Sequence, residues 1–333
     1  MELIIQKPFD AHLHLRQGDS LSGFAQRAAA FFESALVMPN TKPPILTAAD
    51  LGRYRTLIRE AAPALNALMT FQLHTQADIP ALKRAGAVAA KYFPVGLTNS
   101  TGTEAASLSA YDSVLKQMEE TGIVLSIHCE APLYSGTGAK HRVLDEALEA
   151  SVRFPELKIV LEHVSLDREV EAVKNAGKNV AATVTAHHLL FSAVDFIGSR
   201  LNPHLFCKPI LQSEENREAV RRAVLSGNPR FFFGSDSAPH PPESKTGSAV
   251  SPGIYSMPVT IPLLACFFEE YAQTNCMENF VSVFGRRFYG LAETDETLVL
   301  EKRSWKVPEI VDGVVPIGAG TVISWSVRSS GVY

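Results

Sequence analysis

Cysteine is scarce in this sequence, which has only four in 333 residues: Cys129, Cys207, Cys266 and Cys276. No two of them have the C-x-x-C spacing, and four are too few for a disulfide framework. We therefore expect a protein that works in a reducing, cytoplasmic environment.

An excess of either charge is also lacking, because 31 lysines and arginines face 35 aspartates and glutamates, for a formal net charge of −4. Without a basic run, we expect no nucleic-acid partner. Long uncharged apolar runs are missing, and residues 1–16 do not follow the pattern of a signal peptide, so we expect no membrane partner. The 46% of hydrophobic residues suffice for a large globular core.

A glycine-rich phosphate turn is absent after the first apolar run, which argues against an open dinucleotide-binding sheet. Short runs rich in Val, Ile, Leu and Phe alternate with stretches of helical spacing, which is typical of βα units. Most of these runs end roughly 30 residues apart, the length of one such unit. The expected strands are residues 3–14, 35–39, 68–74, 88–93, 123–128, 159–163, 180–185 and 231–235.

Eight consecutive βα units predict an α/β fold of the closed (β/α)8, or TIM, barrel type. No linker or change of composition divides the chain, so we expect a single domain over residues 1–333. Residues from about 290 onward are expected to form tail elements packed on the barrel.

The first expected strand ends in His12-Leu13-His14. Residues i and i+2 of a strand face the same side, so both imidazoles would point inward at the carboxyl end of the barrel. Neutral imidazole is a common ligand of first-row metals. The alternative is a pair of polar histidines at a strand end without a ligand role.

Single histidines end two later strands, His128 in IVLSIHCE and His163 in KIVLEHVS. Active sites of barrels are built at the carboxyl ends of the strands, which favours a shared role for these residues. Asp236 follows the last strand and His240 lies four residues further on. Asp236 is either a helix cap or a metal ligand and proton carrier, and the neighbouring histidines favour the second role.

Lys91 ends an otherwise apolar strand. A free ammonium would be repelled by a metal ion, whereas a carboxylated lysine carries an anionic carbamate that can bridge two ions. The alternative is a snorkelling lysine. Arg16 lies on the same strand face as the first two histidines and suits a substrate carboxylate, with Asn40 beside it. Either residue could instead bond to the barrel rim.

These segments together resemble one known family. FDAHLHLR, ALVMPN, AAKYFP, IHCE, LEHV, PHLFCKPIL and GSDSAPH resemble, in order and position, the motifs of the dihydroorotases of the amidohydrolase superfamily. The similarity extends from about residue 10 to residue 240. It is closest to the short bacterial type that has no flanking β-sandwich, and it implies the barrel of a metal-dependent hydrolase.

The resemblance implies two Zn²⁺ ions per subunit, with Co²⁺ or Mn²⁺ as alternatives. The implied metal ligands are His12, His14 and Asp236 for the more buried ion, His128 and His163 for the more exposed ion, and N6-carboxylated Lys91 as the bridge. The implied reaction is the reversible cyclisation of N-carbamoyl-L-aspartate to L-dihydroorotate in pyrimidine (UMP) biosynthesis. A bridging hydroxide would attack the ring amide and Asp236 would carry the proton. A homodimer is also implied.

The implied substrate contacts are Arg16, Asn40, His240, Lys208, Pro252, Gly253 and, on a loop after the lysine strand, Thr98. Three features depart from the family pattern. Lys208 stands where an apolar residue is expected, the cysteine-rich loop of some relatives is missing, and Pro252 has no N–H, so that a donor there would have to come from Gly253. No metal role is assigned to the other histidines: His74, His141, His187, His188 and His204.

Two kinds of alternative stay open. A hydantoinase, dihydropyrimidinase or allantoinase would share the metal ligands, although the first two would not need Arg16 and Asn40 to hold a ring carboxylate. A barrel that has lost its activity and serves as a scaffold is the other alternative, but such a protein would be expected to lose ligands.

Overall fold

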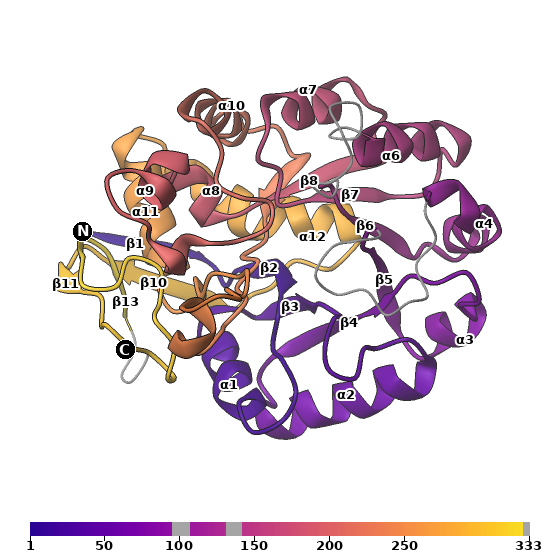
Figure 1. The fold of residues 1–333 in the computed structure, drawn as a ribbon, viewed down its shortest axis with the longest axis horizontal. Helices are drawn as coiled ribbons and strands as arrows, with labels where there is room; N and C mark the ends of the chain where they lie inside the picture. The colour runs from indigo at the N-terminus through magenta and orange to yellow at the C-terminus, as the bar shows by residue number, and fades with distance from the viewer. Residues whose placement is uncertain (95–106, 131–141, 329–333) are drawn as a thin grey trace.

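Eight parallel strands form one sheet in which each strand pairs with the next along the chain (Figure 1). The computed structural model describes residues 1–94, 107–130 and 142–328. The strands are β2 (Phe9–Leu13), β3 (Ser34–Val37), β4 (Asn66–Gln72), β5 (Ala87–Tyr92), β6 (Val124–His128), β7 (Ile159–Glu162), β8 (Val180–Val184) and β9 (Phe231–Phe233). This order confirms the predicted barrel.

Helices cover the outside of the sheet (Figure 1). They are α1 (Leu21–Phe31), α2 (Ala48–Ala61), α3 (Ile79–Arg84), α4 (Asp112–Thr121), α6 (Arg142–Arg153), α7 (Asp167–Asn175), α8 (Ala186–Leu190), α9 (Ala193–Ile197), α10 (Glu214–Leu225), α11 (Thr260–Glu270) and α12 (Phe284–Tyr289). Local sequence sets several helix ends: Thr47 and Asp50 form a capping box at α2, and Gly122 ends α4 with a φ of 68°. Within the described ranges, no helix is long and apolar enough to cross a bilayer.

The core has an inner and an outer layer. The inner layer fills the barrel with side chains from nearly every strand, such as Phe9, Val160 and Phe232, and Tyr289 of α12 joins them. Helix α12 packs directly against this layer, because a Cβ on Gly285 would lie only 2.9 Å from Cδ1 of Phe9. The larger outer layer lies between strands and helices. Apolar packing thus covers both faces of the strands.

The first predicted strand, residues 3–14, is wrong as a single element. The structure divides it into β1 (Glu2–Gln6), which pairs antiparallel with β10 (Thr297–Glu301), and β2 of the barrel. The break falls at Lys7 and Pro8, where proline supplies no N–H for a ladder hydrogen bond. The two strands therefore belong to different sheets.

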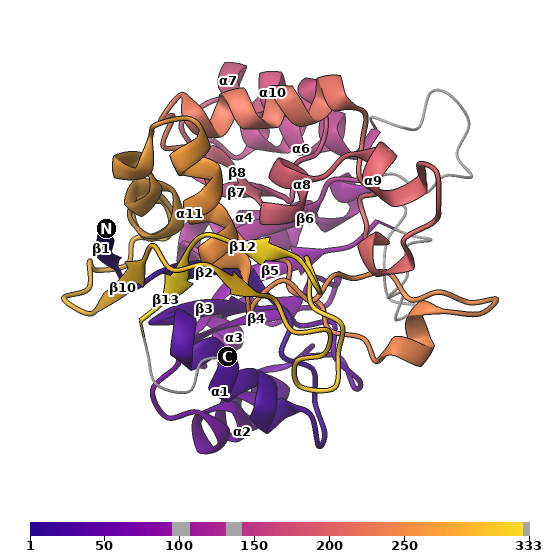
Figure 2. The same cartoon turned by 90° about the vertical axis from the view of Figure 1, so that its left-hand side faces the viewer.

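Residues 291–328 pack along one side of the barrel (Figure 2). Strand β10 lies between β1 and β13 (Ser326–Val327), while β11 (Trp305–Lys306) pairs with β12 (Val322–Ile323). Trp325 is fully buried, and its Nε1 donates to Oε2 of Glu269 in α11 at 3.1 Å. This segment is therefore anchored both to the amino-terminal strand and to a barrel helix.

The barrel closes between β2 and the residues that follow β9. The amide of Asp236 donates to the His12 carbonyl oxygen at 2.8 Å, and the amide of His14 donates to the Ser237 carbonyl oxygen at 3.2 Å. The fully buried Asp10 carboxylate accepts the amides of His12, at 3.0 Å, and Ser235, at 2.8 Å. It also accepts the Ser235 hydroxyl. We call this set of contacts the seam.

We predict that Asp10→Ala lowers the free energy of unfolding by about 3 kcal/mol, because each buried N–H left without an acceptor costs about 1–3 kcal/mol. Urea denaturation of the metal-free protein measures this change. Asp10→Asn is the matched control, since the amide oxygen still accepts both N–H groups, and it should lose much less stability. Equal midpoints for Asp10→Ala and the wild type would show that the seam does not depend on this carboxylate.

Candidate functional site

A cavity of about 900 Å³ opens at the carboxyl ends of the strands. Nearly all the site residues expected from the sequence line it: His12, His14, Arg16, Asn40, Lys91, His128, His163, Lys208, Asp236, His240, Pro252 and Gly253. Thr98 lies outside the described residues. One cavity thus collects side chains from six strand ends and from the loop after β9.

A bulge in β2 turns its two histidines into the barrel. Phe9 and Ala11 belong to the inner core layer but Leu13 belongs to the outer layer, and the register shifts between Asp10 and Leu13. The extra residue of a bulge reverses the alternation of side chains. His12 and His14 therefore both point inward.

These two histidines converge on Asp236. Oδ1 of Asp236 lies 3.0 Å from Nε2 of His14 and 3.4 Å from Nε2 of His12. One ligand atom from each of the three buried residues lies within 4.8 Å of the other two, so they could hold one metal ion. Burial opposes a charged carboxylate, but His12 and the hydrogen bond to His14 outweigh it and lower the pKa of Asp236 well below its usual value.

His128 and His163 form a second pair beside the first. Their ring centroids are 4.5 Å apart, and the His163 ring lies 5.3 Å from that of His12. Burial lowers the pKa of both rings, that of His163 well below its usual value, so both rings are neutral and each keeps a lone pair on one ring nitrogen. Nδ1 of His163 has no hydrogen-bond partner in the described part of the chain. His128 Nε2 lies 3.2 Å from Oε2 of Glu130. A neutral imidazole offers one ring nitrogen to a metal ion, and in His163 that nitrogen has no competing partner in the described ranges.

Lys91 is fully buried at the end of β5 among these groups. Its Nζ has no hydrogen-bond partner in the ranges that the structure describes, and it lies 5.4 Å from the centroid of the Phe93 ring. Burial lowers the pKa of the ammonium to about 8, although Glu162 and Asp236 act in the opposite direction. A buried amine without a partner is costly unless something neutralises it.

Backbone strain is concentrated in this site. Among non-glycine residues in the described ranges, five have positive φ, and three of these are Arg16 (62°), His163 (44°) and Asp236 (43°). Each such conformation costs on the order of 1 kcal/mol and persists where the surrounding structure imposes it. The strain falls on residues that the sequence had already selected.

Glu162 is a site residue that the sequence analysis missed. It is buried at the end of β7, and its carboxylate accepts hydrogen bonds from His12 Nδ1 at 2.7 Å and from the Thr183 hydroxyl at 2.6 Å. The Ser126 hydroxyl donates to its other oxygen. These bonds fix the tautomer of His12 and leave its Nε2 free toward Asp236. The sequence did contain a signal for Glu162. It is a glutamate in an apolar strand, and it lies two residues after Val160, so both side chains face the inside of the barrel.

Arg16 and His240 form one wall of the cavity. A terminal guanidinium nitrogen (NH2) of Arg16 lies 3.0 Å from His240 Nε2, and its Nε donates to the Pro239 carbonyl oxygen at 3.2 Å. Burial and the neighbouring guanidinium lower the pKa of His240 to about 3, so this ring is neutral. No carboxylate in the described ranges lies within ion-pair distance of Arg16, and Oδ1 of nearby Asn40 is buried without a partner. This wall has an unpaired positive charge.

A second wall comes from two loops held together by Lys245. Its Nζ is buried and donates to the carbonyl oxygens of Phe206 at 2.9 Å, Ser251 at 3.0 Å and Gly253 at 2.7 Å. The Gly253 amide donates to Phe206 as well, at 2.9 Å. The Gly253 N–H, from which a donor at Pro252-Gly253 would have to come, is therefore already used by the loop packing. A Cβ at this position would lie 2.7 Å from the Ala238 carbonyl oxygen, so only glycine fits.

Comparison with known proteins shows the family. The model of the amidohydrolase family matches residues 4–294. The chain is 37% identical over 340 residues to a dihydroorotase of Aliivibrio fischeri (strain MJ11), covering 98% of this chain and 99% of that protein.

Solved structures of dihydroorotases also superpose closely on this chain. A dihydroorotase from Campylobacter jejuni superposes with a TM-score of 0.90 at 32% identity, and one from Saccharomyces cerevisiae in complex with 5-fluoroorotic acid does so with 0.91 at 32%. Each comparison covers 98% of both chains. The resemblance found in the motifs is confirmed: this chain belongs to the amidohydrolase family and, within it, to the dihydroorotases.

Proposed function

We propose that this chain catalyses the reversible cyclisation of N-carbamoyl-L-aspartate to L-dihydroorotate, a step of pyrimidine (UMP) biosynthesis. The observation that carries the proposal is a single cavity in which a set of inward-facing metal-ligand residues faces the unpaired Arg16. A substrate with a hydrolysable amide and a carboxylate matches both parts.

The side chains present fit two divalent cations. His12, His14 and Asp236 would hold one ion, His128 and His163 the other, and carboxylated Lys91 would bridge them. The neutral rings of His14, His128 and His163 support this assignment. So do Nζ of Lys91 and Nδ1 of His163, which have no partner in the described part of the chain. Bound ions would lower the pKa of water and polarise the amide carbonyl. Zn²⁺ suits these nitrogen and oxygen ligands, as do Co²⁺ and Mn²⁺.

Carboxylation of Lys91 would resolve the problem of its buried amine. With a pKa of about 8, a useful fraction of the amine is neutral near pH 7. Its lone pair would form an N–C bond to carbon dioxide and one N–H proton would leave to solvent, which turns a cation into an anionic carbamate. Glu162 and Asp236 would then face a bridged metal centre in place of an isolated ammonium.

The other residues would bind and orient the substrate. Arg16, Asn40 and His240 would hold the carboxylate, while Asp236 would take a proton in the attack and give it to the departing ring nitrogen. Lys208, Pro252 and Gly253 also line the cavity and would contact the ring, with Gly253 acting through its shape and not as a donor. Thr98 would close the site from its loop.

We also infer that residues 1–333 form one domain with the segment from about 290 packed on the barrel, which the β1–β10 pairing supports. A cytoplasmic homodimer is proposed from the resemblance to the family.

Comparing substrates tests the activity. We expect ring opening of dihydroorotate to exceed that of hydantoin and allantoin at equal enzyme concentration.

Arg16→Met should raise the KM for dihydroorotate about 10- to 100-fold, since a hydrogen bond to a charged group contributes about 1.5–3 kcal/mol. Any slow turnover of hydantoin, which has no carboxylate, should not change in this variant. Preference for hydantoin would reject the proposal, and loss of every activity in a metal-replete preparation would favour a scaffold.

Lys91→Ala should lose the bridge, so metal content falls below the two equivalents expected for the wild type and activity is lost. Metal analysis measures the metal content. Intact mass measures the carbamate, which would appear as one added CO₂ on the wild type. Lys116→Ala is the control, because Lys116 pairs only with Glu119 on the surface. Wild-type turnover by Lys91→Ala without an added carboxylic acid would disprove the bridge.

Glu162→Gln should weaken metal binding about 10- to 100-fold, the usual effect of removing a carboxylate that orients a ligating histidine. Competition with a chelator measures the affinity. Glu169→Gln is the matched control: Glu169 is also buried, but it accepts the amides of Ser165 and Leu166 instead of orienting a histidine. If both variants bind metal as the wild type does, Glu162 has no orienting role.

A further inference from the structure

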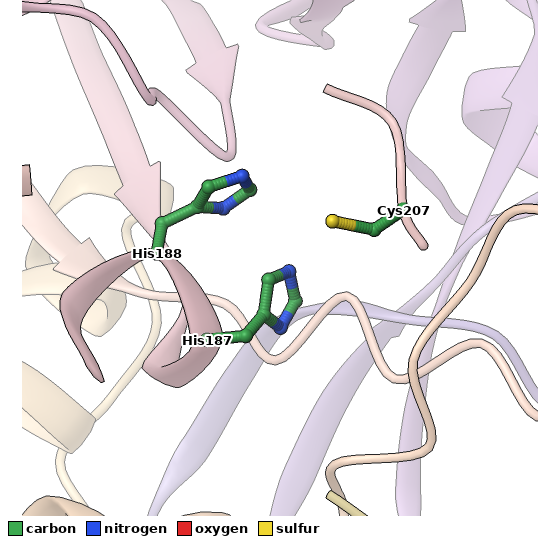
Figure 3. A group of neighbouring side chains, drawn as sticks. All are labelled: His187, His188 and Cys207. Carbon is green, nitrogen blue, oxygen red and sulfur yellow. The ribbon is translucent and has the colours of Figure 1, made fainter. Parts of the chain in front are cut away.

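Three metal-ligating side chains meet outside the cavity: His187, His188 and Cys207 (Figure 3). The two histidines are consecutive in α8, and Cys207 follows the short helical turn η2 (Pro203–Leu205). One ligand atom from each lies within 4.8 Å of the others, and the side chains are 0%, 3% and 1% exposed. None of the three lines the cavity described above.

His187 has no partner for its ring. Both Nδ1 and Nε2 are buried without a hydrogen bond in the ranges that the structure describes. A buried polar group without a partner costs free energy, so each such group calls for a ligand or a water molecule. Burial lowers the pKa of this ring well below its usual value, so it is a neutral imidazole with a free lone pair.

His188 and Cys207 point at the same atom. His188 Nε2 and Cys207 Sγ each lie 3.2 Å from the carbonyl oxygen of Pro209. A carbonyl oxygen only accepts, so both groups carry a proton that is directed to this point. Nδ1 of His188 lies 2.9 Å from the Thr185 hydroxyl, which can donate or accept. The histidine tautomer can therefore reverse and expose a lone pair at Nε2.

We propose that His187, His188 and Cys207 form a further metal site for a borderline or soft cation with a filled d shell, such as Zn²⁺ or Cd²⁺. Two imidazoles and a thiolate are the ligand types that such ions prefer. The site uses none of the residues assigned to the amide chemistry, so it does not depend on the proposed function.

Binding requires two changes of protonation. The Cys207 thiol, whose pKa burial raises, releases its proton to solvent as the S–metal bond forms. The His188 proton moves from Nε2 to Nδ1, where it is donated to Thr185. The Pro209 carbonyl then loses two donors and faces the cation. Ligand atoms of one zinc ion lie on the order of 3.6 Å apart, so the side chains need to close by about 1 Å.

The cluster lies directly behind a wall of the cavity. Lys208, the residue after Cys207, is half-buried and lines that wall, so one residue along the chain separates the cluster from the cavity lining. The three side chains of the cluster supply its nitrogen and sulfur ligands.

Cadmium titration of the zinc-loaded enzyme tests the site. Cys207 thiolate should give a sulfur-to-cadmium charge-transfer band that saturates at one equivalent per chain, because the ligands assigned to the other ions contain no sulfur. Cys207→Ser should abolish the band, and His187→Gln should weaken cadmium binding at least about tenfold. Cys276→Ser, which removes a half-exposed cysteine, should leave the band unchanged.

Cys207→Ala and His187→Asn serve as second variants if the first ones do not fold, and turnover by the zinc-loaded variants reports correct folding. Absence of the band in the wild type overturns the site, as does a band that survives Cys207→Ser. Binding that His187→Gln leaves unchanged also overturns it. A crystal structure with cadmium that shows only water between the three side chains would do the same.

Discussion

The closure of the barrel at its seam is the constraint on which the rest of the site depends. Residues 12–16 and 236–240 are far apart in the chain, and the hydrogen bonds between the ends of β2 and the residues after β9 bring them together. Asp10 binds both sides of this junction from a fully buried position. The contacts of His12 and His14 with Asp236, and of Arg16 with His240, follow from this junction.

Burial then determines the charge state of the site. It favours the neutral forms of His14, His128 and His163 and lowers the pKa of Lys91. The pKa values of Glu162 and Asp236 stay low despite their burial, because nearby His12 and the hydrogen bonds that the two carboxylates accept favour the charged form. The result is a set of lone pairs and negative charges around a small volume. Buried carboxylates without a counter-ion are unfavourable, and divalent cations bound among them would stabilise the arrangement.

Substrate recognition has a different physical basis. Arg16 is held in a left-handed conformation, and Tyr54 donates to its carbonyl oxygen at 2.6 Å. The guanidinium therefore stays beside the cavity without a carboxylate of its own. On the other wall, Lys245 joins two loops through three carbonyl oxygens. Arg16 is part-buried and has no carboxylate partner in the described ranges, whereas Lys245 is buried and donates to main-chain oxygens.

The sequence alone determined the number of βα units, the family, and the residues at the strand ends, because apolar periodicity and short motifs are local properties. It could not separate β1 from β2, since both read as one apolar run until their partners are known. Nor could it find Glu162, Lys245 or the meeting of His187 and His188 with Cys207. Those roles arise from contacts between distant segments, and only the closed barrel, through its bulge, its seam and its packed loops, decides which side chains meet.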